Sequence, residues 1–326
     1  MARSRTTRRN RSAHTVVIVI AAVVAAALTG CAAASGKTSP PMVDLETQFG
    51  HIHGLGADQT AGETYAATHN GVWRIPTGNL PDSYLTGAKR ATDTKVVQIA
   101  GRAQDTMGFT VAAPGLLLAS GHPDPVEQPD LNPPNLGLII STDGAKTWET
   151  LSLRGETDFH DLAAVELPDG ELRVYGYDAT TSTIRISNDS GVTWSSRATL
   201  QLRDLAADPT DPDRVFTTMA GGLLLSDDSG HSFAPLPGAP ALFLITTSDE
   251  ATGGALIGID TNDAIWKQDE TGTWSKTGQT EGTPEALEYV GGSSPWILLA
   301  AERGIVTSDD YGETGTVLVP SKGSAP

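Results

Sequence analysis

The sequence predicts an all-β fold, a β-propeller of six blades, or alternatively seven, preceded by a secretory leader. Three observations predict it. An eight-residue pattern recurs at intervals near 40 residues, short apolar segments bounded by Gly, Pro and Asp flank each copy, and no stretch after Cys31 shows a helical period of three turns. An interval near 40 is the length of one four-stranded propeller blade. With 39% hydrophobic residues among 326, the chain can bury a large core, as one large all-β domain or two small ones.

The first 30 residues are the predicted leader. A basic run ends at Arg11, and residues 15–28 are apolar apart from Thr15. A charged segment, a short apolar segment and small residues at the cleavage point are typical of a secretory signal, and this apolar segment is too short to span a membrane. Residues 28–31 (LTGC) resemble a bacterial lipobox, which implies that Cys31, the single cysteine, is acylated and becomes the mature N-terminus.

The predicted domain order is a lipoprotein signal peptide at residues 1–30, a flexible tether at 31–44 and the propeller at 45–322. Arg8 and Arg9 are not followed by the apolar pair of a twin-arginine signal, which favours ordinary secretion. We therefore expect a secreted protein that is anchored through lipid on Cys31 to the extracytoplasmic face of the cell membrane. Because its one cysteine carries the lipid, the mature protein would contain no disulfide.

The charge of the chain excludes one class of partner. The formal net charge is −17, and the leader holds five Arg and no acidic residue, so the remainder carries 39 acidic and 17 basic residues. Nucleic-acid recognition depends on clustered Lys and Arg, which makes nucleic acid an unsuitable partner. Docking of the folded surface on anionic lipid is disfavoured for the same reason.

The blades can be placed in order by aligning the apolar segments that surround each octet. They start near His51, Met107, Phe159, Arg203, Leu242 and Glu285. The first blade has no octet, and we expect its third strand at residues 71–75 and its fourth at 96–99. A seventh blade would need strands from residues 42–50, a segment that looks too short.

The octet pattern is Ser-x-Asp-x-Gly-x-Thr-Trp, and residues 187–194 match it at every fixed position. Less regular copies begin at residues 141, 226, 267 and 308. We expect the Asp and Ser side chains to bind backbone amides of a tight turn, Gly to supply an unusual backbone dihedral, and Trp to pack between blades. The octet aspartates are therefore predicted to be structural: Asp143, Asp189, Asp228, Asp269 and Asp310.

These octets resemble the Asp-box of the bacterial neuraminidase repeat. Residues 51–55 (HIHGL), 107–110 (MGFT), 120–123 (SGHP) and 158–160 (DFH) look like the recurring elements of a group of sialidase-like Asp-box propeller lipoproteins that are labelled glycosyl hydrolases. A sialidase would hold its substrate carboxylate with three arginines and use a Tyr nucleophile assisted by Glu, with an Asp as the acid. Residues 73–76 (WRIP) resemble a sialidase motif but fall in a third strand, and of the arginine triad only Arg203 maps to the expected site.

Histidines gather on one predicted face of the propeller. In a blade, the loops before the first strand and between the second and third strands open on the same face, opposite the octets. Five histidines map there, and Arg203 and Glu285 align with them at the starts of their blades. A long loop at residues 123–135, stiffened by five prolines, would form a rim or partial lid. Such a concave mouth is the default place for a ligand.

The mouth supplies the candidate site residues. The predicted ligand-binding residues are His51, His53, His69, His122, His160, Tyr177 and Arg203. His51, His53 and His160 are candidate metal ligands, because His-x-His on a strand with a third His nearby suits a transition metal. The catalytic residues are unknown, with the carboxylates Asp158, Asp178 and Glu285 as candidates. The sequence implies no cofactor apart from this candidate divalent metal.

Three functions remain open. The favoured one is a lipid-anchored propeller that binds a small molecule, a glycan or a protein partner at the His-rich mouth without turnover. The second is a glycoside hydrolase acting on an envelope or extracellular glycan, which needs two carboxylates about 5 to 9 Å apart. The third is an assembly factor for a membrane complex. Radial closure protects the sheet edges and favours a monomer.

Overall fold

The computed structural model describes residues 48–76, 95–131, 134–291 and 295–321. All described residues belong to one compact unit. The predicted leader, the tether and the lipidation site Cys31 therefore lie outside the described residues, as do residues 45–47 and 322 of the predicted propeller. Within the part that is described, no helix is long and apolar enough to cross a membrane.

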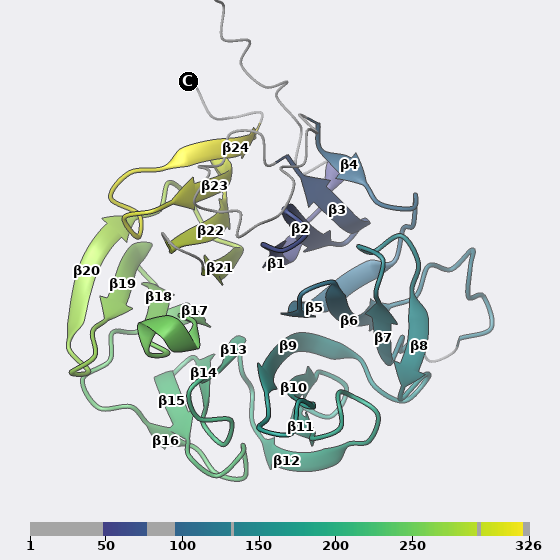
Figure 1. The fold of residues 1–326 in the computed structure, drawn as a ribbon, viewed down its shortest axis with the longest axis horizontal. Helices are drawn as coiled ribbons and strands as arrows, with labels where there is room; N and C mark the ends of the chain where they lie inside the picture. Colours follow the sequence, from purple (N-terminus) through teal and green to yellow (C-terminus); the bar gives the residue numbers. More distant parts are fainter. Residues whose placement is uncertain (1–47, 77–94, 132–133, 292–294, 322–326) are drawn as a thin grey trace, which may run out of the picture. The chain divides into compact units, whose positions relative to one another are not determined.

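Six four-stranded antiparallel sheets follow one another along the chain and form the blades of a propeller (Figure 1). Blade 1 consists of β1 (Ile52–Asp58), β2 (Glu63–Thr68), β3 (Gly71–Ile75) and β4 (Val97–Gln98). Blade 2 consists of β5 (Asp105–Ala113), β6 (Leu116–His122), β7 (Leu138–Ser141) and β8 (Glu149–Ser152). Blade 3 consists of β9 (Phe159–Glu166), β10 (Leu172–Asp178), β11 (Thr183–Ser187) and β12 (Ser195–Thr199).

The second half of the propeller repeats this arrangement. Blade 4 consists of β13 (Asp204–Ala207), β14 (Val215–Met219), β15 (Gly222–Ser226) and β16 (Ala234–Pro235). Blade 5 consists of β17 (Leu242–Thr247), β18 (Leu256–Asp260), β19 (Ala264–Gln268) and β20 (Trp274–Gln279), with the short 3-10 helix η2 (Glu250–Thr252) between its first two strands. Blade 6 consists of β21 (Ala286–Val290), β22 (Trp296–Ala301), β23 (Gly304–Ser308) and β24 (Thr316–Pro320).

The six-bladed prediction is confirmed, and each blade begins within two residues of its predicted start. The seven-bladed alternative is wrong for the described residues, because six sheets contain all of their strands. The expected fourth strand of blade 1 is shorter than predicted, at β4 instead of residues 96–99.

The second strand of each blade shows why the sequence reads as short apolar segments. These strands are packed on both faces by their neighbours, so β18 is buried at every residue and β22 at all but its last. A strand that is covered on both faces carries a continuous apolar run and not an alternating pattern. The fourth strands lie at the rim, and β12 and β20 contain no buried residue.

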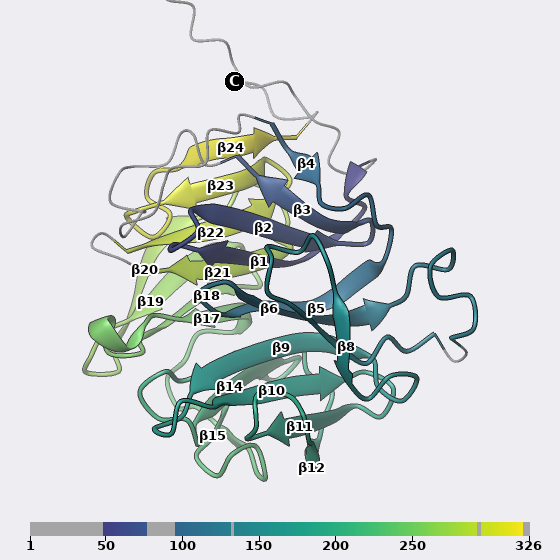
Figure 2. The same cartoon turned by 45° about the vertical axis from the view of Figure 1, so that its right-hand side comes forward.

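The first strands surround the centre and pack against one another around the ring, as Figures 1 and 2 show. Contact between β1 and β21 closes the ring. Ile52 and Leu55 of blade 1 share an apolar cluster with Val290 and Trp296 of blade 6, and the Ile52 amide donates to Glu285 Oε2 at 2.9 Å. Because each described strand belongs to a single blade, this packing and these side-chain bonds hold the first blade to the last.

The octets connect third strands to fourth strands, and those of blades 2, 3, 4 and 6 form one recurring turn in which a Ser hydroxyl donates to the octet Asp. In blade 5, Lys267 replaces this Ser, and Asp269 accepts from Thr271 and from the Thr273 amide. At residues 187–194, Ser187 Oγ donates to Asp189 Oδ1 at 2.7 Å, and the same carboxylate accepts from the amide and the hydroxyl of Thr193 at 2.8 and 2.6 Å. Gly191 has a φ of 92° and donates its amide to Ser187 Oγ. The indole of Trp194 donates to Ser152 Oγ of blade 2, so the turn also ties two blades together.

The octet of blade 6 offers a matched test of this turn. Asp310 accepts hydrogen bonds from Ser308 Oγ and from the amide and hydroxyl of Thr314, whereas its neighbour Asp309 is exposed. Asp310→Ala is expected to lower the free energy of unfolding by about 1–2 kcal/mol, as loss of a side-chain cap does. Asp309→Ala is the control and should change it by less than about 0.5 kcal/mol. Urea unfolding measures both, and equal losses would contradict the assigned role of Asp310.

Candidate functional site

The antiparallel order of each blade brings the start of its first strand and the end of its second strand to the same end of the propeller. Asp105, the first residue of β5, lies opposite His122, the last residue of β6. His53 and His160 are the second residues of β1 and β9, and His69 directly follows β2. We call this end the mouth and define it by His51, His53, His69, Asp105, His122, Asp158 and His160.

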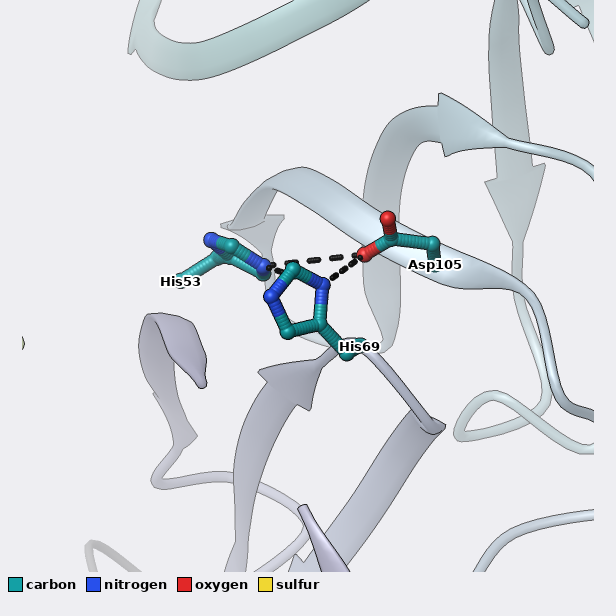
Figure 3. A group of neighbouring side chains, drawn as sticks. All are labelled: His53, His69 and Asp105. Atoms are coloured by element: carbon teal, nitrogen blue, oxygen red, sulfur yellow. Dashed lines mark hydrogen bonds and ion pairs between the residues drawn. The ribbon is translucent and has the colours of Figure 1, made fainter. Parts of the chain in front are cut away.

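The first group of mouth residues joins blades 1 and 2 (Figure 3). His69 Nδ1 lies 2.8 Å from Asp105 Oδ1, and His53 Nε2 lies 3.2 Å from the same His69 nitrogen and 3.6 Å from the same oxygen. Two ring nitrogens thus face one carboxylate oxygen. His51 stands beside the group, with its Nδ1 at 3.4 Å from His53 Nδ1.

The second group joins blades 2 and 3. Asp158 Oδ2 lies 3.1 Å from His122 Nε2 and 2.9 Å from His160 Nε2. The side chain of Asp158 is only 10% exposed, whereas those of His122 and His160 are 40% and 33% exposed. A largely buried carboxylate therefore lies beneath two imidazoles that solvent can reach.

Asp105 and His122 connect the two groups. Asp105 presents Oδ1 to His69 and Oδ2 to His122 Nδ1, which lies at 3.0 Å. His122 in turn presents its second nitrogen to Asp158. The mouth is therefore one continuous array across blades 1, 2 and 3.

The array shifts the pKa values of its members. Burial alone would raise the pKa of Asp105, but hydrogen bonds from His122, His53 and His69 hold it well below its usual range. Burial opposes ionisation of Asp158 too, and hydrogen bonds from His122 and His160 lower its pKa to about 2. Hydrogen bonds to Asp105 and Asp158 raise the pKa of His122 to about 10. Near neutral pH the metal-free array holds two carboxylates with a protonated His122 between them.

Arg203 and Glu285 lie at the neighbouring part of the channel. Both line the central cavity together with His53, and Arg203 Nη2 donates to the Glu285 carbonyl at 3.3 Å. Glu285 uses its carboxylate to accept from the Ile52 amide. Both residues thus help to join blades at the channel, and neither is a member of the two His–Asp groups.

Two predicted mouth residues are used elsewhere. Asp178 is fully buried at the end of β10, where it forms an ion pair with Arg185 at 2.9 Å and accepts from Thr181 Oγ1. Tyr177 is 8% exposed. The candidate catalytic carboxylates Asp158, Asp178 and Glu285 therefore have three different sets of partners and form no common group among the described residues.

The predicted metal trio is also divided. His53 belongs to the first group, His160 to the second, and His51 to neither. The reason is geometric: His53 and His160 come from blades 1 and 3, and blade 2 lies between them. Blade 2 supplies the missing partners, Asp105 and His122.

Asp105 is not among the residues predicted from the sequence, although the sequence contains a signal for it. At the starts of blades 1, 2 and 3, one position of the alignment is occupied by His53, Met107 and His160. Two residues earlier the sequence has His51, Asp105 and Asp158. Aligning that earlier position across the blades identifies an acidic or imidazole side chain in all three.

The described part of the Pro-rich loop at residues 123–135 is held beside the mouth by hydrogen bonds and an ion pair. Asp124 accepts hydrogen bonds from the amides of Ala103 and Val126, and Glu127 forms an ion pair with Arg102. Asp124 is buried and follows His122 and Pro123 directly in the sequence, so these hydrogen bonds fix the start of the loop. These bonds anchor the loop to the segment that leads into β5.

Below the mouth, the central cavity has a volume of about 190 Å³ and is lined by the first strands of all six blades. Besides Glu285, three acidic residues of the first strands line it: Asp161 of β9, Asp204 of β13 and Glu288 of β21. Asp161 and Asp204 share a hydrogen bond, and burial together with Asp204 raises the pKa of Asp161 well above its usual value. Burial raises the pKa of Asp204 to about 6, and burial with the nearby Asp204 charge raises that of Glu288 to about 8. Asp204 is not among the residues predicted from the sequence, because its neighbours become evident only when the ring is closed.

The sequence matches no protein-family model and no curated protein. Among solved structures, a gluconolactonase from Xanthomonas campestris has a TM-score of 0.55 at 13% identity, covering 79% of this chain and 85% of that one. The nidogen/laminin complex has a TM-score of 0.54 at 11% identity, covering 78% and 93%. An ancestral GH74 enzyme has a TM-score of 0.49 at 13% identity, and the match covers 79% of this chain but only 36% of that one. Identities this low show the propeller fold alone, and the Asp-box and sialidase-like identities stay predictions.

Proposed function

We propose that this protein is a lipid-anchored, extracytoplasmic β-propeller whose His-rich mouth binds a divalent transition-metal ion. The observation that carries the proposal is the group formed by His122, Asp158 and His160. Two imidazole nitrogens and one carboxylate oxygen are a donor set suited to zinc and neighbouring first-row metals.

The donor spacing supports this assignment. A tetrahedral ion with ligands at about 2.0–2.1 Å separates its donor atoms by about 3.3 Å. In the group, Asp158 Oδ2 lies 3.1 Å from His122 Nε2 and 2.9 Å from His160 Nε2, and all three donors lie within 4.8 Å of one another. Small side-chain rotations are sufficient to bring them to one ion.

The environment of Asp158 also supports a cation site. Its second oxygen, Oδ1, is buried and has no hydrogen-bond partner among the described residues. A buried carboxylate oxygen without a partner costs free energy. A cation on this carboxylate would offset that cost, and the two partly exposed imidazoles leave room for further ligands on the ion.

The predicted location rests on the sequence. The basic and apolar leader and the lipobox-like residues before Cys31 support export and lipid anchoring. A metal site on such a protein would meet ions outside the cytoplasm.

The glycoside hydrolase alternative has less support from the geometry. Asp105 and Asp158 flank His122, but both have lowered pKa values, and a glycosidase needs one carboxylic acid that donates a proton. Asp161 and Asp204 include a protonated group, but they touch each other, which is closer than the separations of about 5 to 9 Å that glycosidases use.

The test is metal titration of the tag-free full chain in detergent, with Zn²⁺ as the probe at pH 7.5. We expect saturable binding, and an at least about 100-fold weaker affinity in His122→Ala/His160→Ala. His231→Ala is the control, because His231 is exposed in the octet of blade 4 at the other end of the blade. Binding should weaken at lower pH, because the ion must displace the proton of His122. No binding by the wild type, or unchanged binding by the double variant, would refute the proposal.

A further inference from the structure

The first group, His53, His69 and Asp105, repeats the donor set of the second at the adjoining pair of blades. Its donor separations of 2.8, 3.2 and 3.6 Å bracket the edge of about 3.3 Å expected around a tetrahedral ion. Figure 3 shows both imidazoles turned toward the same Asp105 oxygen. The two groups therefore have the same chemistry, two nitrogens and one carboxylate oxygen.

We propose that the mouth binds two metal ions, one in each group, and that Asp105 couples them. This inference rests on the proposed function and adds to it a second ion and a link between the two sites. Asp105 ligates one ion through Oδ1 and, through Oδ2, holds the His122 ring that ligates the other.

The two oxygens of Asp105 carry this inference. Oδ1 lies 2.8 Å from His69 Nδ1, inside the first group, whereas Oδ2 lies 3.0 Å from His122 Nδ1, on the far side of the imidazole from Asp158. With an ion on His122 Nε2, the remaining Nδ1 must carry the proton and donate it to Asp105. A carboxylate that accepts from a ligating His fixes the tautomer and ring orientation and strengthens the ligand.

The shared carboxylate predicts how the two ions influence each other. An ion on Oδ1 withdraws electron density from Asp105, which weakens its hydrogen bond to His122. Two cations connected through Asp105 and His122 also repel each other. The second ion should therefore bind more weakly than the first, in whichever order the sites fill.

The experiment compares two ways of removing the first site. The probe is Co²⁺ added to the tag-free full chain, with ions per protein measured by elemental analysis and the coordination followed by visible absorption. His53→Ala/His69→Ala should retain one ion in an unaltered second site. Asp105→Asn should also retain at most one, but with an affinity about 10- to 100-fold lower, because His122 has lost its carboxylate partner. Asp105→Glu keeps the charge and should recover part of that affinity.

Each outcome has one meaning. Two ions in the wild type with a weakened second site in Asp105→Asn support the inference. Two ions in the wild type, with the remaining ion bound equally tightly by Asp105→Asn and by His53→Ala/His69→Ala, overturn the coupling. A single wild-type ion that is lost in His122→Ala/His160→Ala overturns the second site but leaves the proposed function standing, and no ion at all removes both. Far-ultraviolet circular dichroism and melting temperature identify any misfolded variant, in which case Asp105→Glu provides the comparison with His53→Ala/His69→Ala.

Discussion

Replacing Phe159 by Ala is expected to lower the free energy of unfolding by about 4 kcal/mol, as truncation of a fully buried aromatic ring does. The ring is 0% exposed, and its centroid lies 4.7 Å from that of Trp194. It fills the space above Gly176, where an added Cβ would lie 2.6 Å from the ring. The cavity left by Ala would open between blades 2 and 3.

The same substitution should also disturb the mouth. Asp158 and His160 flank Phe159 in sequence, and the Phe159 amide donates to Ser120 Oγ of blade 2 at 3.0 Å. The buried ring therefore fixes the part of the chain that supplies two of the three donors in the second group. Phe159→Ala should weaken Zn²⁺ binding as well as stability, and titration of the folded variant measures this loss.

Two controls separate cavity formation from general damage. Phe159→Leu keeps much of the volume and should cost about 1–2 kcal/mol. Phe243→Ala removes a partly exposed ring from β17 and should cost less than Phe159→Ala. Urea unfolding gives all three values, and a Phe159→Ala loss no larger than that of Phe243→Ala would show that the ring is not a packing anchor.

Replacing Glu288 by Gln is expected to stabilise the protein at pH 8 by about 2 kcal/mol and to have little effect at pH 5. Burial in the channel, with the Asp204 carboxyl nearby, raises the pKa of Glu288 to about 8. Between its ordinary pKa and 8, the folded state keeps this proton while the unfolded state has lost it, so the wild type loses stability as the pH rises through that window. The expected stabilisation of Glu288→Gln is smaller than the full pKa shift implies, because water can reach the partly exposed carboxyl from the channel.

The measurement is urea unfolding of wild type and Glu288→Gln at four pH values from 5 to 8. Asp161 and Asp204 titrate in the same channel in both proteins, and Arg203, His53 and Glu285 line it too, so only the difference between the curves reports on Glu288. Glu166→Gln, at the exposed end of β9, is the control and should follow the wild type. A difference that stays constant from pH 5 to pH 8 would mean that Glu288 titrates normally.

Much of the fold could be predicted because its signals are local. The hydrogen bonds that shape the octet turn join residues at most four positions apart, such as Asp189 to Thr193, so eight residues are enough to specify the turn. Five such turns at nearly equal intervals fix the number of strands between them. The blade starts were therefore predicted to within two residues, and blade 1, which has no octet, was found from its apolar strands.

The candidate site could be predicted only in part. The face that gathers the histidines follows from strand order, since the end of a second strand always returns to the start of a first strand in an antiparallel sheet. The partners of each histidine do not follow from it. His53 was grouped with His160, but the structure pairs His53 with Asp105 and pairs His160 with Asp158 and His122.

The repeating turn, the six blades and the histidine-rich end could be predicted from sequence alone, and the leader with its lipobox resemblance stays a prediction. Which side chains meet across blades became evident only in the folded structure: His69 with Asp105, His122 with Asp158, and Asp161 with Asp204 in the channel. The difference lies in the sequence separation of the contacts. A turn is specified by hydrogen bonds between near neighbours, whereas the contacts between blades at the mouth and in the channel join residues 36 or more positions apart and depend on how six sheets pack to close the ring.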